Sequence, residues 1–149
     1  MIVVDASVAV KWFLKETYSD HAITLLTLQH KLVGPTLAMY EVASAFSRAL
    51  KRGDIDTDEA TNCRDRWLYA IKSSVFRLEH DNRDIVRASE LAAKLAHPFA
   101  DCVYLALAER LDATLVTADA VFIEKHQKGD RVIHVHDVHS LFLADPVLN

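Results

Sequence analysis

Short, continuously apolar runs alternate along the chain with longer stretches whose apolar residues recur at helical spacing. The short runs are too brief for helices and are typical of strands buried on both faces of a parallel sheet. They lie at residues 1–4, 31–34, 75–79, 113–117 and 131–136. Because strands and helices alternate and no β-hairpin signal joins two runs, the sequence predicts an α/β fold: a three-layer α/β/α sandwich with a mostly parallel central sheet.

Amphipathic helices are expected between these strands. The clearest one runs from Thr36 to Arg52 and ends at Gly53, a residue type suited to a helix C-terminus. Asp56 and Glu59 have the spacing of a capping box, which begins the next helix. Further helices are predicted at residues 6–14, 19–30, 82–96, 99–111 and 138–143. The expected inner face of the helix at 82–96 consists of Ile85, Ala88, Ala92 and Leu95.

The composition agrees with a single globular domain over residues 1–149. Of the 149 residues, 51% are hydrophobic and 26% charged, with only 3 Gly and 3 Pro, which excludes collagen-like and disordered classes. No apolar run approaches membrane-spanning length and no secretory signal is visible, so we expect a cytoplasmic protein without membrane contact. Cys63 and Cys102 lie at core-like helix positions without CxxC spacing, and neither a disulfide nor a zinc site is expected.

The net charge of −4 argues against non-specific binding of polyanions. The argument weakens if acidic side chains gather in one site and are neutralised by divalent cations, because basic stretches elsewhere can then hold a phosphate backbone. Lys11 and Trp12, together with basic residues on two predicted helices, fit such a role. These basic residues are Arg48, Lys51, Arg52, Arg64 and Arg66. The alternative is that the basic residues are solvated helix ends and Trp12 is a core residue.

Four acidic residues occupy positions where a site is expected. Asp5 follows the first strand, and Asp119 follows the strand at 114–117. Asp101 lies in the first turn of its helix, and Glu41 lies beside the apolar stripe of the clearest helix. Ligands of open α/β sheets bind at the carboxyl ends of the strands, and three of the four residues face that edge. Each residue also has an ordinary explanation, as part of a turn, a helix start or a solvated helix face.

Gathered in one cleft, four carboxylates repel one another unless cations bind between them. Oxygen-only ligands suit Mg²⁺ or Mn²⁺. Such ions keep most of their waters and also bind substrate phosphates. That arrangement is suited to cutting a phosphodiester bond with a metal-activated water.

The order and spacing of these acidic motifs resemble the PIN-domain family. The resemblance rests on Val3-Val4-Asp5-Ala6-Ser7, a helix carrying Glu41, Phe99-Ala100-Asp101-Cys102-Val103-Tyr104-Leu105-Ala106-Leu107-Ala108, and Leu115-Val116-Thr117-Ala118-Asp119. It spans the chain from Met1 to about His136. Within the family, the short single-domain form is similar to VapC-type toxin ribonucleases of type II toxin–antitoxin systems. The implied fold is PIN-like and Rossmann-like.

The resemblance also implies a metal-dependent endoribonuclease that cleaves single-stranded RNA and inhibits translation or growth until an antitoxin neutralises it. Mg²⁺ is the implied cofactor and Mn²⁺ a substitute. The implied catalytic, metal-binding residues are Asp5, Glu41, Asp101 and Asp119. Ser7 and Thr117 match hydroxyl positions that help to order this site, although helix capping and strand-end packing explain them equally well.

The partners implied by the resemblance are a VapB-type antitoxin, an RNA substrate and a second copy of the chain. The antitoxin peptide would lie in a groove between the early helices and block the cleft. The implied assemblies are a homodimer and, with the antitoxin, a heterotetramer or larger complex.

Rival interpretations of the same residues also stand. A PIN fold without catalysis would serve as an RNA- or protein-binding scaffold. An aspartyl-phosphate phosphatase also places an Asp after its first strand, but usually with a second Asp two residues on, where Ser7 stands. His134 and His136 share one face of a predicted strand, but Asp137 alternates away from them, so no ligand completes a zinc site.

Overall fold

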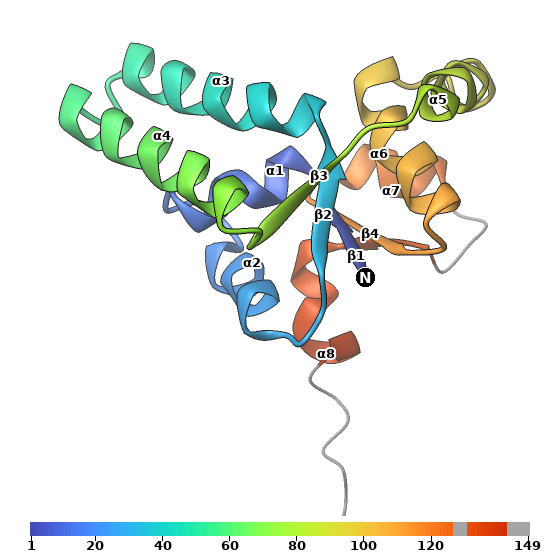
Figure 1. Cartoon of the computed structure of the whole chain (residues 1–149), viewed down its shortest axis with the longest axis horizontal. Helices are drawn as coiled ribbons and strands as arrows, with labels where there is room; N and C mark the ends of the chain where they lie inside the picture. The colour runs from blue at the N-terminus through green and yellow to red at the C-terminus, as the bar shows by residue number, and fades with distance from the viewer. Residues whose placement is uncertain (127–130, 143–149) are drawn as a thin grey trace, which may run out of the picture.

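A five-stranded parallel sheet forms the centre of the computed structural model, which describes residues 1–126 and 131–142 (Figure 1). The strands lie in the order β3-β2-β1-β4-β5, and every neighbouring pair is parallel. Their bounds are β1 Ile2–Val4, β2 Leu32–Pro35, β3 Phe76–Glu79, β4 Thr114–Thr117 and β5 Val132–His134. β1 is buried along its whole length, as its continuous apolar run predicts.

Helices cover both faces of this sheet. Figure 1 shows α2, α3 and α4 on one side and α5, α6 and α7 on the other, which confirms the predicted three layers. The helices before β3 are α1 Ala6–Ala9, η1 Val10–Trp12, α2 Ser19–Thr24, η2 Leu25–Thr27, α3 Leu37–Arg52 and α4 Thr57–Lys72. Those after β3 are α5 Asn82–Leu95, α6 Phe99–Arg110, α7 Ala120–Lys125, η3 Val135–Asp137 and α8 Val138–Phe142. Among the described residues, no single helix is long and apolar enough to span a membrane.

Local sequence signals account for several helix ends. The Asp56 side chain accepts a hydrogen bond from the Glu59 N–H, and the Glu59 side chain accepts one from the Asp56 N–H, so the predicted capping box begins α4. Gly53 ends α3 at φ 78°, a left-handed conformation that glycine adopts without a Cβ clash. Asp81 caps α5 through the Arg83 N–H. Cys63 and Cys102 are buried in α4 and α6, at the core positions that were predicted.

Other details of the prediction are wrong. The helices expected at 6–14 and 19–30 are each shorter and end in a 3₁₀ turn, and α7 was not predicted at all. Ile85, expected on the inner face of α5, is 52% exposed, whereas Leu91 is buried. β5 ends at His134 rather than His136. The predicted last helix does form, but its expected end at residue 143 lies outside the described residues.

The strand order positions the site. β1 is central, and the chain runs outward from it through β2 and β3 on one side and β4 and β5 on the other. The carboxyl ends of β1 and β4 therefore lie side by side where the direction of winding changes. Ligands of open parallel sheets bind at such a point.

Candidate active site

Asp5 lies at the carboxyl end of β1 and is held on three sides. Its N–H donates to the Val116 carbonyl of β4 over 3.0 Å. Its carboxylate Oδ2 accepts two hydrogen bonds of 2.7 Å, from Ser7 Oγ and from Thr117 Oγ1. Burial raises the pKa of Asp5, and the two hydroxyl donors act against that rise. One buried carboxylate thus has a fixed orientation.

Besides binding Asp5, the hydroxyls of Ser7 and Thr117 accept hydrogen bonds from the backbone that follows β4. Ser7 Oγ accepts a hydrogen bond of 3.2 Å from the Ala118 N–H, and Thr117 Oγ1 accepts one of 3.1 Å from the Asp119 N–H. The two hydroxyls therefore connect Asp5 to the segment that carries Asp119. Ser7 makes no side-chain cap of α1, so the capping explanation for this residue is wrong.

Glu41 reaches the same cleft from α3. Its Oε1 accepts a hydrogen bond of 2.7 Å from the Tyr104 hydroxyl of α6. Burial raises the pKa of Glu41, the Tyr104 bond opposes the rise, and the charges of Asp5 and Asp101 add to it. Glu41 is half-buried, and the hydrogen bond from Tyr104 directs its carboxylate toward α6. Tyr104 was not predicted as a site residue.

Asp101 and Asp119 meet at one imidazole. His97 Nε2 lies 2.9 Å from Asp101 Oδ2 and 3.5 Å from Asp119 Oδ2. Burial raises the pKa of Asp101, and the Asp119 charge adds to that effect while His97 opposes it. Asp119 also caps α7, since its Oδ1 accepts a hydrogen bond of 3.0 Å from the Phe122 N–H. Asp119 therefore begins a helix instead of opening a turn, and it also lies beside His97 in the cleft.

The four predicted carboxylates converge on one edge of the sheet. Within the described part of the chain, no Lys or Arg side chain forms an ion pair with any of them, and their only ion-pair partner is His97. Burial combined with mutual repulsion leaves an uncompensated negative cleft, which a divalent cation would neutralise. The oxygen donors suit Mg²⁺ or Mn²⁺, and Asp5, Glu41, Asp101 and Asp119 are the carboxylates that could hold such an ion.

His97 escaped the sequence prediction because His97-Pro98 was interpreted as a helix break. The break is real, since Ala96 adopts a left-handed conformation with φ 47° before α6 begins. The available signal was a histidine four residues before Asp101, in the short connection directly ahead of α6.

Other predicted candidates lie elsewhere or are occupied. Trp12 is buried and its Nε1 donates to the Ala22 carbonyl over 2.8 Å, so it is a core residue and not a stacking face. Lys11 is also buried and pairs with Glu16 at 3.0 Å. Contrary to expectation, Asp137 turns back toward the histidines and contacts His136 Nε2 at 2.9 Å. Within residues 1–126 and 131–142, the only trio of possible metal ligands with atoms all within 4.8 Å of one another is His97, Asp101 and Asp119.

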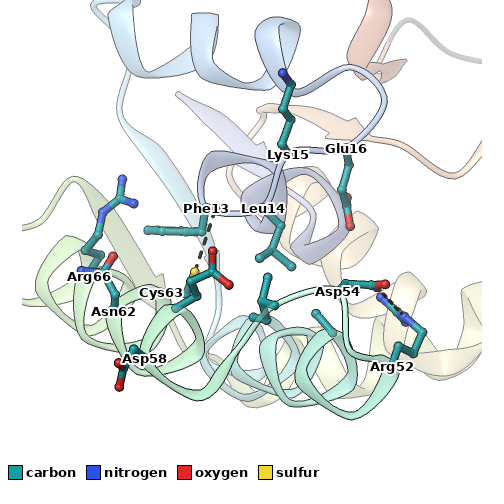
Figure 2. A pocket seen from close by; sticks show the side chains of 13 residues that line it. Phe13, Leu14, Lys15, Glu16, Arg52, Asp54, Asp58, Asn62, Cys63 and Arg66 are labelled. Atoms are coloured by element: carbon teal, nitrogen blue, oxygen red, sulfur yellow. Dashed lines mark hydrogen bonds and ion pairs between the residues drawn. The ribbon is translucent and has the colours of Figure 1, made fainter.

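A separate pocket of about 710 Å³ lies between the segment after η1 and the α3–α4 hairpin. Figure 2 shows Leu14 pointing toward the hairpin, with Arg66 and Arg52 at the two ends of the pocket. Apolar side chains mix here with charged ones of both signs, and none of the four carboxylates lines it. The lining residues include Phe13, Leu14, Ile55, Asp58 and Arg66.

Comparisons with known proteins agree with this architecture. The family model described as PIN domain matches residues 2–127. The chain is 31% identical over 126 residues to Ribonuclease VapC3 of Pyrobaculum aerophilum, covering 83% of this chain and 93% of that protein. The crystal structure of PAE2754 from Pyrobaculum aerophilum superposes with a TM-score of 0.73 at 22% identity, over 97% of both chains. A toxin–antitoxin complex from Klebsiella pneumoniae gives 0.66 at 15% identity, over 91% and 98% of the two chains. At these identities the two structures show a shared fold.

Proposed function

We propose, from the premise that the chain belongs to the PIN-domain family, that it is a metal-dependent endoribonuclease which cleaves single-stranded RNA. The observation that carries this proposal is the convergence of Asp5, Glu41, Asp101 and Asp119 on one uncompensated cleft at the carboxyl edge of the sheet. The name of the relative Ribonuclease VapC3 supports RNA as the substrate.

The chain's own residues would prepare this cleft for a phosphodiester. When bound, Mg²⁺ or Mn²⁺ would supply positive charge for the phosphate oxygens and lower the pKa of an attacking water. Ser7 and Thr117 fix the orientation of Asp5, and Tyr104 fixes that of Glu41. Preorganised ligands of this kind avoid the cost of rearrangement during the reaction.

A cleavage assay on a labelled single-stranded RNA tests the proposal. The protein is expected to cleave with Mg²⁺ or Mn²⁺ and to lose cleavage in EDTA. Asp5→Asn should abolish activity, because it keeps the size of the side chain and removes the charge. Asp20→Asn, at an exposed position of α2, is the matched control and should leave activity intact.

Undiminished cleavage in EDTA would refute the metal mechanism. Tight RNA binding without cleavage under any divalent ion would favour the scaffold alternative. A duplex of the same sequence distinguishes the substrate classes, because single strands expose the base faces and edges that a duplex conceals.

The chain is further proposed to be the toxin of a toxin–antitoxin pair, inhibiting translation until an antitoxin of the VapB type binds it. Support comes from the name of the relative Ribonuclease VapC3 and from the fold shared with the toxin–antitoxin complex of Klebsiella pneumoniae. The pocket of Figure 2 lies between early helices, where the antitoxin segment is expected, and its mixed lining suits an amphipathic peptide.

Co-expression with an antitoxin of the VapB type, sought in the reading frame next to that of this chain, tests this partner. Growth arrest by the chain alone and rescue by the neighbour are expected. Arg66→Glu, inside the pocket, should weaken the complex by about tenfold or more, whereas Arg64→Glu, on the same helix but outside the pocket, should not. Equal effects of the two variants would place the antitoxin elsewhere. Light scattering at micromolar concentration tests the proposed homodimer and heterotetramer, which a strictly monomeric mass would contradict.

A further inference from the structure

His97 is a buried imidazole with a fixed orientation inside the proposed metal cleft. The backbone N–H of His97 donates to the Ala92 carbonyl over 3.2 Å at the left-handed turn between α5 and α6. Its ring stacks on Phe122 of α7, with centroids 4.5 Å apart and planes 14° apart. The side chain is only 4% exposed. Stacking and burial together leave this ring little freedom to turn away from the carboxylates.

His97 Nε2 lies at ion-pair distance from two carboxylates without forming a hydrogen bond to either of them. It approaches Asp101 Oδ2 at 2.9 Å and Asp119 Oδ2 at 3.5 Å, yet within the described residues neither ring nitrogen makes a hydrogen bond of acceptable geometry. Buried polar atoms without partners cost free energy and are uncommon in native proteins. A nitrogen that lies close to two carboxylate oxygens without directing an N–H at either is suited to share a cation with them.

We infer that His97, Asp101 and Asp119 form a mixed nitrogen–oxygen site for a divalent transition-metal ion such as Mn²⁺, with His97 Nε2 as a direct ligand. One atom from each residue lies within 4.8 Å of the other two, so a single ion can contact all three. This inference rests on the proposed metal-dependent function and goes beyond it, since it concerns which ion the cleft selects.

The ligand chemistry sets the direction of that selection. An imidazole nitrogen is a better ligand for transition-metal ions, Mn²⁺ included, than for Mg²⁺. Mg²⁺ prefers oxygen ligands and keeps several of its own waters. A site with one imidazole and two carboxylates therefore favours Mn²⁺ over Mg²⁺ more than an all-carboxylate site does. The neighbouring Asp5 and Glu41 remain oxygen donors on the other side of the cleft.

Pulsed electron paramagnetic resonance of the full chain loaded with Mn²⁺ tests this directly. Modulation from a coordinated ¹⁴N is expected, and it should disappear in His97→Gln. Isothermal titration should show the variant losing about tenfold or more in Mn²⁺ affinity while its Mg²⁺ affinity changes little. His126→Gln is the matched control, because His126 also has a buried unpartnered Nδ1 within the described residues but lies outside the cleft.

Each outcome separates this inference from the proposed function. Bound Mn²⁺ without nitrogen modulation, or an equal loss of Mn²⁺ and Mg²⁺ affinity in His97→Gln, would overturn the inference and identify His97 as an ion-pair partner of Asp101. RNA cleavage that persists in that case leaves the proposed function intact. A nitrogen signal without any cleavage would refute the nuclease and keep the metal site. Circular dichroism and a thermal melt of both variants establish that they fold.

Discussion

Thr117 ends β4 and also supports the site. Its side chain is fully buried, donating to Asp5 Oδ2 and accepting from the Asp119 N–H. One hydroxyl therefore links the Asp5 carboxylate to the backbone of Asp119, another of the proposed metal ligands. The sequence left open whether this residue packs or orders the site; in the structure it is buried and hydrogen-bonded to Asp5, and we propose that it orders the site.

Replacing Thr117 with Val is expected to lower activity far more than stability. Val keeps the shape of the side chain but removes the donor to Asp5, whose pKa should rise further as a result. We expect a loss of about 10–100-fold in metal affinity or in kcat/KM, measured by titration and RNA cleavage. Thr114→Val, at the other end of β4, is the control and should be nearly silent. Equal losses in the two variants would contradict the ordering role of Thr117.

Tyr104 and His97 contact the proposed metal ligands, although neither was predicted from the sequence as a site residue. Tyr104 falls in the apolar stripe of α6 and is buried like its neighbours, yet its hydroxyl orients Glu41 from 63 positions away in sequence. His97 stands beside a proline that ends a helix, which is a sufficient local explanation. The Tyr104 contact joins α6 to α3 and carries no local signal, and the spacing of His97 from Asp101 does not show that Asp119 also reaches the imidazole.

At the scale of elements, β2 depends on a glycine that leaves room for an aromatic ring. A Cβ built on Gly34 would collide with Phe76 Cζ of the neighbouring strand β3. Phe76 is fully buried and packs against Trp12 and Trp67, with centroids 6.0 and 5.0 Å away. The ring therefore has no space into which it can withdraw.

Gly34→Ala should destabilise the fold by about 1–3 kcal/mol, the usual cost of overpacking a core. Thermal or urea unfolding measures the change. Adding Phe76→Leu should recover part of the loss, because the smaller side chain vacates the space that the new methyl needs. Gly53→Ala tests the other use of glycine: its φ of 78° makes the substitution costly although the space is open, and Phe76→Leu should not rescue it. Simple additivity in the Gly34 pair would rule out the clash.

The orientation of α5 explains why the spacing of its apolar residues wrongly placed Ile85 on the inner face. Asp84 is buried, and its two carboxylate oxygens accept hydrogen bonds of 2.7 and 2.9 Å from Arg110 of α6. Asp84, Ala88 and Leu91 share the inward face, so Ile85 turns outward. The spacing of apolar residues places a charged residue such as Asp84 on the solvent face. It contains no information about Arg110, the partner on another helix that allows Asp84 to be buried.

At the scale of the whole molecule, the carboxylates of the proposed metal cleft repel one another when no ion is bound, and this repulsion lowers the stability of the fold. Burial raises the pKa of Asp5, of Glu41 and of Asp101, and each of them is raised further by at least one neighbouring carboxylate. A carboxyl whose pKa is raised on folding stabilises the fold while protonated. That contribution is complete below the ordinary pKa and is lost as the pH rises through the folded value.

Asp101→Asn should therefore raise the melting temperature of the metal-free protein at pH 7. A gain of about 2–4 °C is expected for each kcal/mol of repulsion removed in a chain of this length. The advantage should shrink as the pH falls toward 3.8, the ordinary pKa of the residue, where the wild-type side chain is itself protonated. Melts in EDTA across this pH range measure it, with Asp20→Asn as the exposed control.

With saturating Mn²⁺, the wild-type protein should instead melt at a higher temperature than the Asp101→Asn protein. The wild-type protein gains stability from an ion that binds only its folded state, whereas the Asp101→Asn protein lacks a ligand and gains less. A wild-type protein that melts at the same temperature with and without the ion would contradict the proposed metal site.

The amino-acid sequence was sufficient for the five strands, for the parallel sheet between helical layers and for most of the helices, and it also led to the four carboxylates that we propose as metal ligands. These features rest on short-range signals: continuous apolar runs, the capping box at Asp56, Gly53 at a helix end, and acidic residues placed after buried strands. Such signals are local because backbone geometry and the burial of a single element generate them.

The tertiary structure alone established which side chains act on those carboxylates. Ser7 and Thr117 meet at Asp5 because β1 and β4 are neighbours in the sheet, and Tyr104 reaches Glu41 because α6 and α3 approach the same edge. His97 joins Asp101 and Asp119 because α7 presents Phe122 to its ring. Each contact depends on how elements pack together, and packing is a property of the complete fold.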